Sequence, residues 1–202
     1  MKVLIVVSHP RTNSLTFAIT ERFVQGLQAA GHEAEVLDLH RCGFDPVLRE
    51  ADEPDWSGTP KTYSAEAEAE IARMKRYDAL AYIFPIWWYN VPAMLKGYID
   101  RVWNNGYAYG SGKLHHERVL WLGLAAASLA HFEKRNYDQM LAQQLNVGMA
   151  NYAGIANSKL EILYDTLDAD QRHIERLLER AYELGLHYAE GSGDGSPAVE
   201  HE

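Results

Sequence analysis

The sequence predicts a doubly wound α/β fold whose five parallel strands follow the order 2-1-3-4-5. Two observations support this prediction. Apolar runs without polar interruption, typical of strands buried on both faces, occur at residues 3–7, 79–84 and 119–126. Segments with apolar residues at helical spacing separate these runs, and short crossovers favour neighbouring parallel strands. With 202 residues and 47% hydrophobic composition, the chain is expected to form one domain.

The first half of the chain alternates as this fold requires. After the strand at residues 3–7, the apolar residues from Leu15 to Ala30 predict a helix that faces the sheet, with Gly31 as its C-cap. Residues 33–39 are short and partly polar, which indicates an edge strand. Residues 40–63 predict an irregular segment, and its length indicates a functional or partner-facing role. Ser64 is expected to cap a helix that continues through Arg76.

The second half repeats the pattern. The strand at residues 79–84 ends at Pro85, which cannot donate to a sheet ladder, and Pro92 begins a helix that ends at residues 104–106. After the strand at 119–126 we expect a helix from about Lys134 to about Met149, a last strand at 160–164 and a closing helix at 168–187. Residues 190–202 have little apolar content and predict a disordered tail, so the domain is expected to span residues 1–189.

Composition excludes several classes of protein. The net charge of −9, from 28 acidic and 19 basic residues, argues against a nucleic-acid partner. The single cysteine, Cys42, cannot form an internal disulfide and fits a reducing compartment. The first residues lack the architecture of a signal peptide, and no apolar stretch approaches the roughly 18 residues that span a bilayer. We therefore expect a cytoplasmic protein without membrane insertion.

Polar side chains follow the first strand. The next helix begins immediately afterwards, and its N-terminus presents unpaired N–H groups and a positive dipole end that suit a phosphate. The side chains that add donors here are His9, Arg11, Thr12, Asn13, Ser14 and Thr16. Neither the GxGxxG nor the GxxxxGK[ST] pattern is present. The alternative interpretation is that Asn13 or Ser14 only caps the helix.

An aromatic run, Ile86-Trp87-Trp88-Tyr89, follows the third strand. Three large rings in a row cannot all point into one core, so at least one is expected to offer a flat surface to a flat ligand. The predicted order places the first and third strands side by side at the topological switch point, where such sheets bind ligands. A phosphate site and an aromatic surface in one crevice indicate a flavin nucleotide. The alternative is that the rings are only core.

Several motifs resemble those of a known family. They are Ser8-His9-Pro10, Ser14-Leu15-Thr16, Phe44-Asp45-Pro46-Val47-Leu48, Phe84-Pro85-Ile86-Trp87-Trp88-Tyr89, Val91-Pro92-Ala93-Met94-Leu95-Lys96-Gly97, Asp100-Arg101-Val102 and Gly106-Tyr107-Ala108-Tyr109-Gly110. Together they resemble the flavodoxin-like NAD(P)H dehydrogenase (quinone) family, which includes the mammalian quinone reductase and bacterial ancillary subunits of glutathione-gated potassium efflux systems. The likeness covers roughly residues 1 to 190, and residues 85–109 are its most specific part.

The resemblance implies a homodimeric enzyme that holds FMN, or alternatively FAD, and passes hydride from NAD(P)H through the flavin to a quinone or a similar small-molecule acceptor. It places the phosphate and ribityl end of the flavin at His9, Leu15 and Thr16. The isoalloxazine ring would lie against Pro85, Ile86, Trp87, Trp88 and Tyr89. Ala108 and Tyr109 match positions near the acceptor, which makes Tyr109 a candidate catalytic residue.

The chain departs from the family after its fourth strand. The family commonly has Thr-Thr-Gly-Gly there, with backbone N–H groups near the flavin pyrimidine, whereas this chain has Leu124-Ala125-Ala126-Ala127. Alanine can donate the same hydrogen bonds if φ is negative, but is strained where φ is positive.

A tyrosine and a histidine that stabilise charge on the reduced flavin of the mammalian enzyme fall at Phe132 and near Asp138, so that pair is expected to be absent. His131 resembles a histidine of the bacterial branch and is a second candidate catalytic residue, although a lone histidine is more often structural. No metal site is expected.

Two other functions stay open at this level. One is a regulatory ancillary subunit of a membrane transporter, with residues 40–63 as its docking surface and reductase activity secondary or lost. The other is a flavodoxin-type electron carrier, which the aromatic pocket argues against. The sequence does not choose between FMN and FAD, or between NADH and NADPH.

Overall fold

Five parallel strands form one sheet in the order β2-β1-β3-β4-β5 in a computed structural model that describes residues 1–57 and 61–190. This confirms the predicted topology. The strands are β1 (Lys2–Val7), β2 (Glu33–Asp38), β3 (Ala79–Pro85), β4 (Arg118–Leu124) and β5 (Ser158–Leu163). Val7 is level with Ile83, and Pro85 is level with Leu124. The carboxyl ends of β1, β3 and β4 therefore lie along one edge of the sheet.

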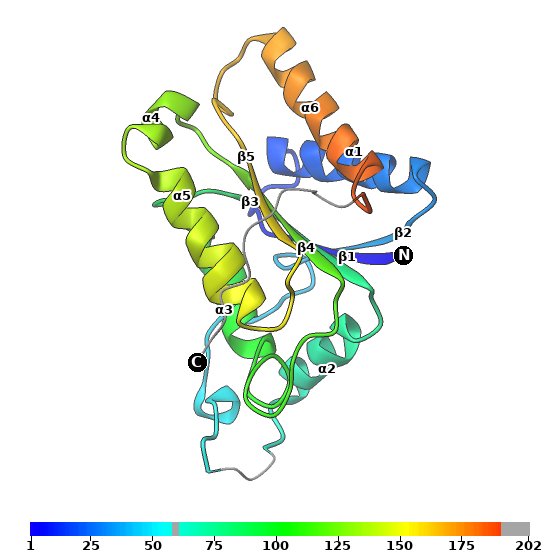
Figure 1. Ribbon diagram of the computed structural model, residues 1–202, viewed down its shortest axis with the longest axis vertical. Helices are drawn as coiled ribbons and strands as arrows, with labels where there is room; N and C mark the ends of the chain where they lie inside the picture. The colour runs from blue at the N-terminus through cyan, green and yellow to red at the C-terminus, as the bar shows by residue number, and fades with distance from the viewer. Residues whose placement is uncertain (58–60, 191–202) are drawn as a thin grey trace.

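Helices cover both faces of this sheet (Figure 1). One face carries α1 (Leu15–Ala29) and α6 (Gln171–Leu186), and the other carries α2 (Ala65–Met74), α3 (Ala93–Val102) and a π-helix, η2 (Gln143–Asn151). Alternate residues of the central strands enter the two apolar layers: Ile83 packs on the α1 and α6 side, and Tyr82 on the α2 and α3 side. A strand covered on both faces must be apolar throughout, which explains the uninterrupted runs in the sequence.

Helices α1 and α6 approach each other closely at two glycines. A Cβ atom on Gly26 would lie 2.1 Å from the backbone oxygen of Tyr182, and one on Gly185 would lie 2.1 Å from the backbone oxygen of Phe23. These contacts are with backbone, which cannot rotate away as a side chain can. Both positions therefore require glycine.

In its described residues, 39–57 and 61–64, the segment between β2 and α2 is mostly irregular, as predicted, and contains one short 3₁₀ helix, η1 (Glu50–Asp52). A buried ion pair attaches it to α3: the Arg101 guanidinium lies 2.8 Å from the Asp52 carboxylate and also donates to Glu66 and to the backbone oxygen of Asp45. Ser64 donates to the same Asp52 carboxylate and caps α2, as predicted. The segment is therefore held on the body of the protein by paired charge.

The helix predicted from about Lys134 to about Met149 corresponds to the continuous helical residues 137–151, but a separate short helix that was not predicted precedes it. The structure has α4 (Leu129–Glu133), α5 (Tyr137–Ala142) and then η2. Ser128 caps α4 by accepting from the N–H of His131 at 3.3 Å, so helix begins five residues earlier than expected. Asn136 then interrupts it with a φ of 54°, a conformation that asparagine adopts more easily than most residues.

The predicted disordered tail falls almost entirely at residues 191–202, which lie outside the described residues. Within residues 1–57 and 61–190, no helix combines the length and the apolar character needed to cross a membrane.

Candidate functional site

The loop after β1 contains buried hydroxyl groups without partners. Ser8 and Ser14 are both buried, and neither hydroxyl makes a hydrogen bond to any described residue. Ser14 occupies the N-cap position of α1, but its side chain does not cap the helix, so the simple capping interpretation is wrong for Ser14. A buried hydroxyl without a partner costs free energy. The loop and the N-terminus of α1 thus offer donors to a group that this chain does not supply.

Arg41 fixes the shape of this loop. Its guanidinium donates to the backbone oxygens of His9 at 2.8 Å and Pro10 at 2.7 Å. Nδ1 of His9 lies 3.1 Å from the backbone nitrogen and 3.0 Å from the backbone oxygen of Arg11. Sequence reasoning missed Arg41 because it lies on the turn after β2, about thirty residues away along the chain. Its role follows only from the pairing of β1 with β2.

The other three residues predicted for this end differ in their positions. The Arg11 side chain is exposed and makes no hydrogen bond within the described residues. Leu15 is half-buried and packs on the core beneath α1. Thr16 is buried in the first turn of α1, where its backbone oxygen accepts from the Thr20 hydroxyl at 2.8 Å. Ser8 was not predicted as a binding residue. Its buried, unpaired hydroxyl makes it a better candidate for a ligand contact than the exposed Arg11.

The aromatic loop after β3 is a tight and strained turn. Trp87 and Asn90 exchange two backbone hydrogen bonds of 3.1 Å, and the two residues between them, Trp88 and Tyr89, have φ values of 53° and 54°. This is a type I′ geometry, which normally takes asparagine and glycine. Two bulky residues in the left-handed region store strain, and strain of this kind concentrates at functional sites. The Trp88 side chain is 95% exposed.

A cavity of about 250 Å³ lies beside this turn. Its lining residues are Ile86, Trp88, Tyr89, Ala125, Ala126, Ala127 and Phe132. Six of these were predicted from the sequence, and they come from the loops after β3 and β4. Trp87 lies outside the lining but near the β1 loop, with its ring 6.3 Å from that of His9. Pro85 and Leu124 pair at the strand ends beneath, where the Leu124 oxygen accepts from the Ile86 N–H at 2.8 Å.

The three alanines after β4 are not strained. None of them has a positive φ. The backbone oxygens of Ala125 and Ala127 accept from the N–H groups of Thr166 at 3.0 Å and Asp165 at 3.2 Å, which holds the segment in place. Within the described chain, the N–H groups of Ala126 and Ala127 donate to nothing. The site therefore retains free donors beside an apolar cavity, and the residues present fit a flavin.

His131 lies behind the cavity wall and is not an isolated histidine, because two other side chains contact its ring. Its Nε2 lies 3.0 Å from the Tyr89 hydroxyl oxygen, and Arg135 Nη1 lies 3.4 Å from its Nδ1. The Tyr137 ring stacks on Tyr89 with 3.8 Å between centroids, and Phe132 packs edge-on against Tyr89. The break at Asn136 brings α4 and α5 together on this one ring. Sequence reasoning missed the pairing of Tyr89 with His131 because it depends on that break.

Tyr109 lies in a different cluster. Its ring is 5.8 Å from that of Trp56 and 6.1 Å from that of Tyr152. It does not line the cavity described above. Burial, followed by the proximity of Tyr152, raises the pKa of the Tyr109 hydroxyl above its usual value. One copy of the chain therefore does not bring the two predicted catalytic residues, Tyr109 and His131, to the same place.

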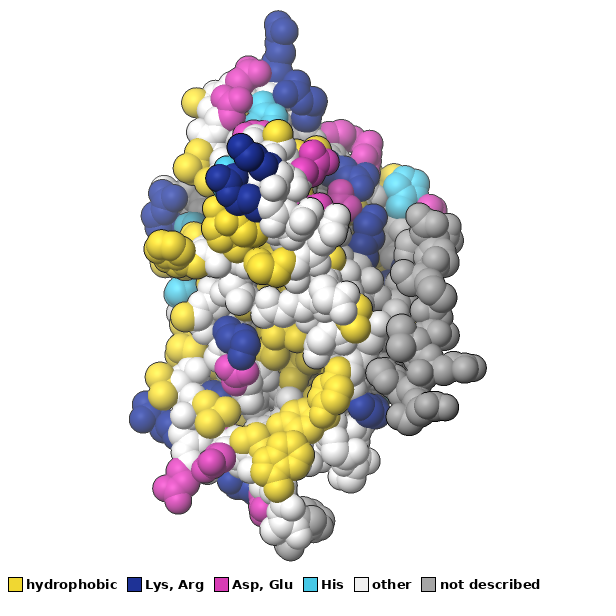
Figure 2. All heavy atoms as spheres, turned by 60° about the vertical axis from the view of Figure 1, so that its left-hand side comes forward, with side chains coloured by type: hydrophobic (Ala, Val, Ile, Leu, Met, Phe, Trp, Pro, Cys, Tyr) yellow, Lys and Arg dark blue, Asp and Glu magenta, His cyan; other side chains and the backbone are white. Residues whose placement is uncertain are grey.

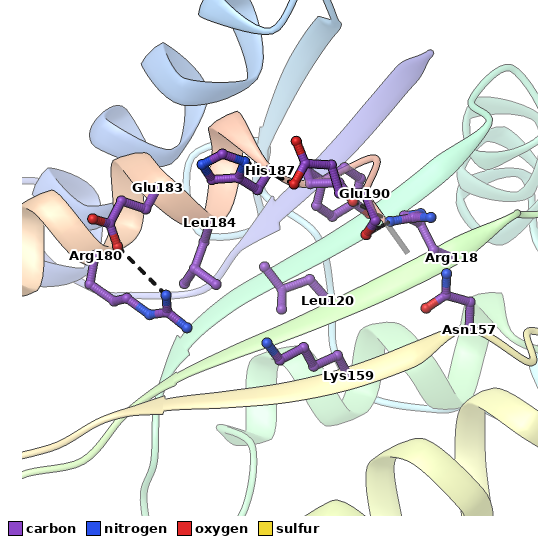
Figure 3. A pocket seen from close by; sticks show the side chains of 10 residues that line it. Arg118, Leu120, Asn157, Lys159, Arg180, Glu183, Leu184, His187 and Glu190 are labelled. Atoms are coloured by element: carbon purple, nitrogen blue, oxygen red, sulfur yellow. Dashed lines mark hydrogen bonds and ion pairs between the residues drawn. The ribbon is translucent and has the colours of Figure 1, made fainter. Parts of the chain in front are cut away.

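A second hollow, of about 500 Å³, lies at the opposite end of the sheet between α6 and the amino-terminal parts of β4 and β5 (Figure 3). Most of its charged side chains are paired within the described residues: Arg180 pairs with Glu183 and Glu161, Lys159 also pairs with Glu161, and Nη1 of Arg118 donates to the backbone oxygens of Tyr188 and Glu190, although Nε of Arg118 is buried without a partner. None of the predicted site residues lines it. We place the candidate site at the strand carboxyl ends instead.

Comparison with known proteins agrees with this geometry. Residues 1–184 match the family model described as flavodoxin-like fold. The chain is 38% identical over 175 residues to an uncharacterized NAD(P)H oxidoreductase, YcaK, of Escherichia coli, an alignment that covers 85% of this chain and 89% of the relative. It is 31% identical over 123 residues to NAD(P)H dehydrogenase (quinone) 1 of Cavia porcellus, covering 54% of this chain but only 45% of the relative.

Among solved structures, the chain superposes on an NAD(P)H:quinone oxidoreductase from Methanothermobacter marburgensis with a TM-score of 0.88 at 30% identity, covering 96% of this chain and 99% of the other. An FMN-dependent NADH-azoreductase of Bacillus anthracis, solved with FMN, has a TM-score of 0.67 at 17% identity and shares the fold. The strand order, the candidate site at the carboxyl ends of the strands and the match over residues 1–184 lead to one conclusion. This chain belongs to the flavodoxin-like fold family.

Proposed function

We propose that this protein is a flavin-dependent NAD(P)H oxidoreductase that transfers hydride through a bound flavin to quinones or related electrophiles. One observation supports the proposal above all: the apolar cavity with free backbone donors at Ala126 and Ala127 lies at the same sheet edge as the unpaired hydroxyls of Ser8 and Ser14. A flavin nucleotide has a flat ring that accepts hydrogen bonds at one end and an anionic phosphate at the other. The names of the relatives support the same reading.

The flavin supplies the redox chemistry when it is bound. The task of the chain is to hold it. Ile86, Trp88 and Tyr89 provide the apolar wall, and the N–H groups of Ala126 and Ala127 provide donors at its edge. At the other end, the N-terminus of α1 with the Ser14 and Thr16 side chains would hold the phosphate, assisted by His9. We propose FMN as the cofactor, with FAD as the alternative, and NAD(P)H as the electron donor.

Tyr89 and His131 provide a polar group in an otherwise apolar wall. The hydroxyl of Tyr89 and the imidazole of His131 share a hydrogen bond of 3.0 Å, so a change of charge at the cavity edge can be compensated through the pair. We propose that His131 is a positioning residue, which acts at the flavin through Tyr89. Electrostatic preorganisation of this kind is a large contribution to enzyme catalysis in general.

A homodimer would explain the position of Tyr109. Figure 2 shows hydrophobic side chains gathered on the face that carries α5. Exposed large apolar residues of the described chain include Trp56, Trp88, Met140, Val147 and Tyr152, and Trp56 packs on Tyr109. We propose that two copies cover such a surface, with Tyr109 near the acceptor site of one of them. Sedimentation equilibrium should give twice the mass of one chain, and a monomer at micromolar concentration would contradict this proposal.

The decisive experiment is an absorbance titration of the purified protein. FMN or FAD is added first, then NADPH or NADH without oxygen, and then a benzoquinone. Flavin peaks that shift on binding, bleach with the nicotinamide and return with the quinone are the expected result. Flavin that binds but does not bleach would contradict the oxidoreductase proposal, and failure of both flavins to bind in excess would remove its basis.

The regulatory alternative gains no support from the proteins compared above, whose names are those of oxidoreductases. The segment between β2 and α2, which was its candidate docking surface, is attached to α3 by Arg101 and Asp52. For location, the single cysteine of the sequence fits a reducing compartment, and we propose the cytoplasm.

A further inference from the structure

The wall of the cavity contains a hydrogen bond whose direction decides what Tyr89 can offer to a ligand. The Tyr89 hydroxyl oxygen and His131 Nε2 are 3.0 Å apart, and Tyr89 lines the cavity. A neutral imidazole carries its single proton on either nitrogen, so either partner can be the donor. If His131 Nε2 accepts, the Tyr89 hydroxyl donates its proton to His131 within the cavity wall. If His131 donates, that proton is free to face the cavity.

The position of Arg135 favours one direction. Its Nη1 lies 3.4 Å from His131 Nδ1, at the other side of the ring. A guanidinium has donors and no acceptor, so Nδ1 must present its lone pair to it. The ring proton of the neutral imidazole is then on Nε2, and Nε2–H donates to the Tyr89 oxygen. Among the described residues the Tyr89 hydroxyl has no hydrogen-bond partner besides His131, so its own proton has no acceptor within the chain.

A second histidine of the same chain shows the same arrangement with an unambiguous partner. His173 Nε2 lies 3.2 Å from the backbone oxygen of Tyr164, and Arg176 Nη2 lies 3.3 Å from His173 Nδ1. A carbonyl oxygen can only accept, so Nε2 of His173 carries the proton. An arginine on Nδ1 therefore accompanies an Nε2–H tautomer at a site where the backbone dictates it. This pair, on α6, serves as an internal reference.

We propose that Arg135 is a positioning residue that holds His131 in the Nε2–H tautomer, so that the Tyr89 hydroxyl donates its proton to an acceptor atom of the flavin. This rests on the proposed function, because the flavin is taken as the occupant of the cavity. The carbonyl oxygens and ring nitrogens of an isoalloxazine are acceptors of the kind that such a hydroxyl needs. Arg135 would thus influence a ligand that it does not touch, through two hydrogen bonds in series.

The tautomer can be measured on the protein without flavin. Long-range ¹H–¹⁵N correlation spectra distinguish Nε2–H from Nδ1–H imidazole, recorded at about pH 8.5, two units above the ordinary pKa of histidine. We expect His131 and His173 to show the same Nε2–H pattern in the wild-type chain. Arg135→Ala should shift His131 towards Nδ1–H, and Arg135→Lys, which keeps a donor without an acceptor, should restore the wild-type pattern. An Nδ1–H pattern for wild-type His131 would overturn the proposal.

Arg176→Ala is the matched control. It removes an arginine from Nδ1 of His173 while the Tyr164 oxygen still requires Nε2–H. The His173 pattern should therefore stay unchanged, as should the His131 pattern. If Arg135→Ala also leaves His131 unchanged, Arg135 has no positioning role and the proposal fails.

Flavin affinity tests the second half of the proposal. Loss of one neutral hydrogen bond in Tyr89→Phe should raise the FMN dissociation constant about three- to tenfold. Arg135→Ala should raise it less, about two- to fourfold, and should cause no further change when Tyr89 is already Phe. An equal effect of Arg135→Ala in both backgrounds would mean that Arg135 acts on the ligand by its charge alone, which would overturn the proposal.

Failure of the proposed function gives a different result. If the wild-type protein binds neither flavin, Tyr89 cannot be a donor to one, and the inference falls with the function even where the tautomer pattern is as expected. If flavin binds and the tautomer pattern is reversed, the proposed function stands and only the role of Arg135 is lost.

Discussion

Ser14 is the residue whose environment most directly indicates a missing partner. Its hydroxyl is buried, it stands at a helix N-cap, and it bonds to nothing in the described chain. Ser14→Ala removes no hydrogen bond, so the free energy of unfolding should change by less than about 0.5 kcal/mol. The FMN dissociation constant should rise about two- to tenfold, because the phosphate loses a donor. Thermal unfolding without flavin and a fluorescence titration with FMN measure the two quantities.

Ser64 provides the matched control for this prediction. It is also an N-cap serine, but its hydroxyl accepts from the Ala67 N–H at 3.3 Å and donates to Asp52 at 2.9 Å. Ser64→Ala should lower the free energy of unfolding by about 1 to 2 kcal/mol and leave flavin affinity unchanged. The opposite pattern, with Ser14→Ala unstable and affinity intact, would show that Ser14 has a purely structural role.

Gly123 lies next to Ile86, one of the residues that line the cavity. A Cβ atom there would lie 2.8 Å from Cδ1 of Ile86, which is the end of a flexible side chain. Gly123→Ala should therefore fold, with Ile86 displaced towards the cavity that it lines. We expect FMN affinity to fall about tenfold or more, and Ile86→Val, which removes Cδ1, to recover part of the loss in the double variant. Equal affinity of Gly123→Ala and wild type in a fluorescence titration would refute this.

At the scale of secondary-structure elements, the contact of α1 with α6 tolerates little change. Gly26→Ala places a methyl group 2.1 Å from a backbone oxygen, so the helices must separate, and the free energy of unfolding should fall by about 2 kcal/mol or more. Gly148→Ala is the control, because its nearest atom, the Gln143 oxygen, is 3.7 Å away. That substitution in η2 should be neutral or stabilising by up to about 1 kcal/mol. Urea unfolding of both variants gives the comparison.

The elements also show where sequence reasoning succeeds. The five strands, α1, α2, α3 and α6 were predicted because each depends on local periodicity: a strand covered on both faces, such as β3, is apolar throughout, and a helix over a sheet repeats its apolar residues every three or four positions. After β4, the short helix α4 and the break before α5 were missed, because a capping bond at Ser128 and a left-handed Asn136 determine them. Periodicity contains no information on either.

The site shows the same division. Six cavity residues were predicted, because strand order alone brings the ends of β3 and β4 together; they are Ile86, Trp88, Tyr89, Ala125, Ala126 and Ala127. Arg41 was missed, because its target is a pair of backbone oxygens, and backbone groups leave no trace in the residue types. Tyr109 was expected at the same site, and the fold of one chain places it in another cluster. Local patterns thus predicted the loops, and long-range contacts determined their details.

For the molecule as a whole, one buried histidine makes stability depend on pH. His116 is 3% exposed and its Nε2 lies 3.1 Å from the Met74 oxygen. Burial lowers the pKa of His116 from 6.5 to about 4. Between these values the unfolded chain binds a proton that the folded chain does not, so this contribution is complete above pH 6.5 and is lost as the pH falls to 4.

The expected loss from His116 is up to about 3 kcal/mol in the free energy of unfolding over that range. His116→Gln cannot take up the proton, so its unfolding curve should fall less steeply between pH 6.5 and 4. Urea unfolding at intervals of half a pH unit gives both curves. Parallel curves for the wild type and the variant would show that His116 is not the source of the dependence.

The turn at Trp88 and Tyr89 has a consequence for any attempt to evolve this protein in the laboratory. Both residues stand in the left-handed region, at a cost of about 1 to 2 kcal/mol each that glycine would avoid. A selection that rewards only heat resistance should therefore enrich glycine at these two positions, and a selection for flavin retention should reject the same variants, because the rings form the cavity wall. The residues found at positions 88 and 89 after each selection would show whether the natural sequence is adapted to stability or to flavin binding at this turn.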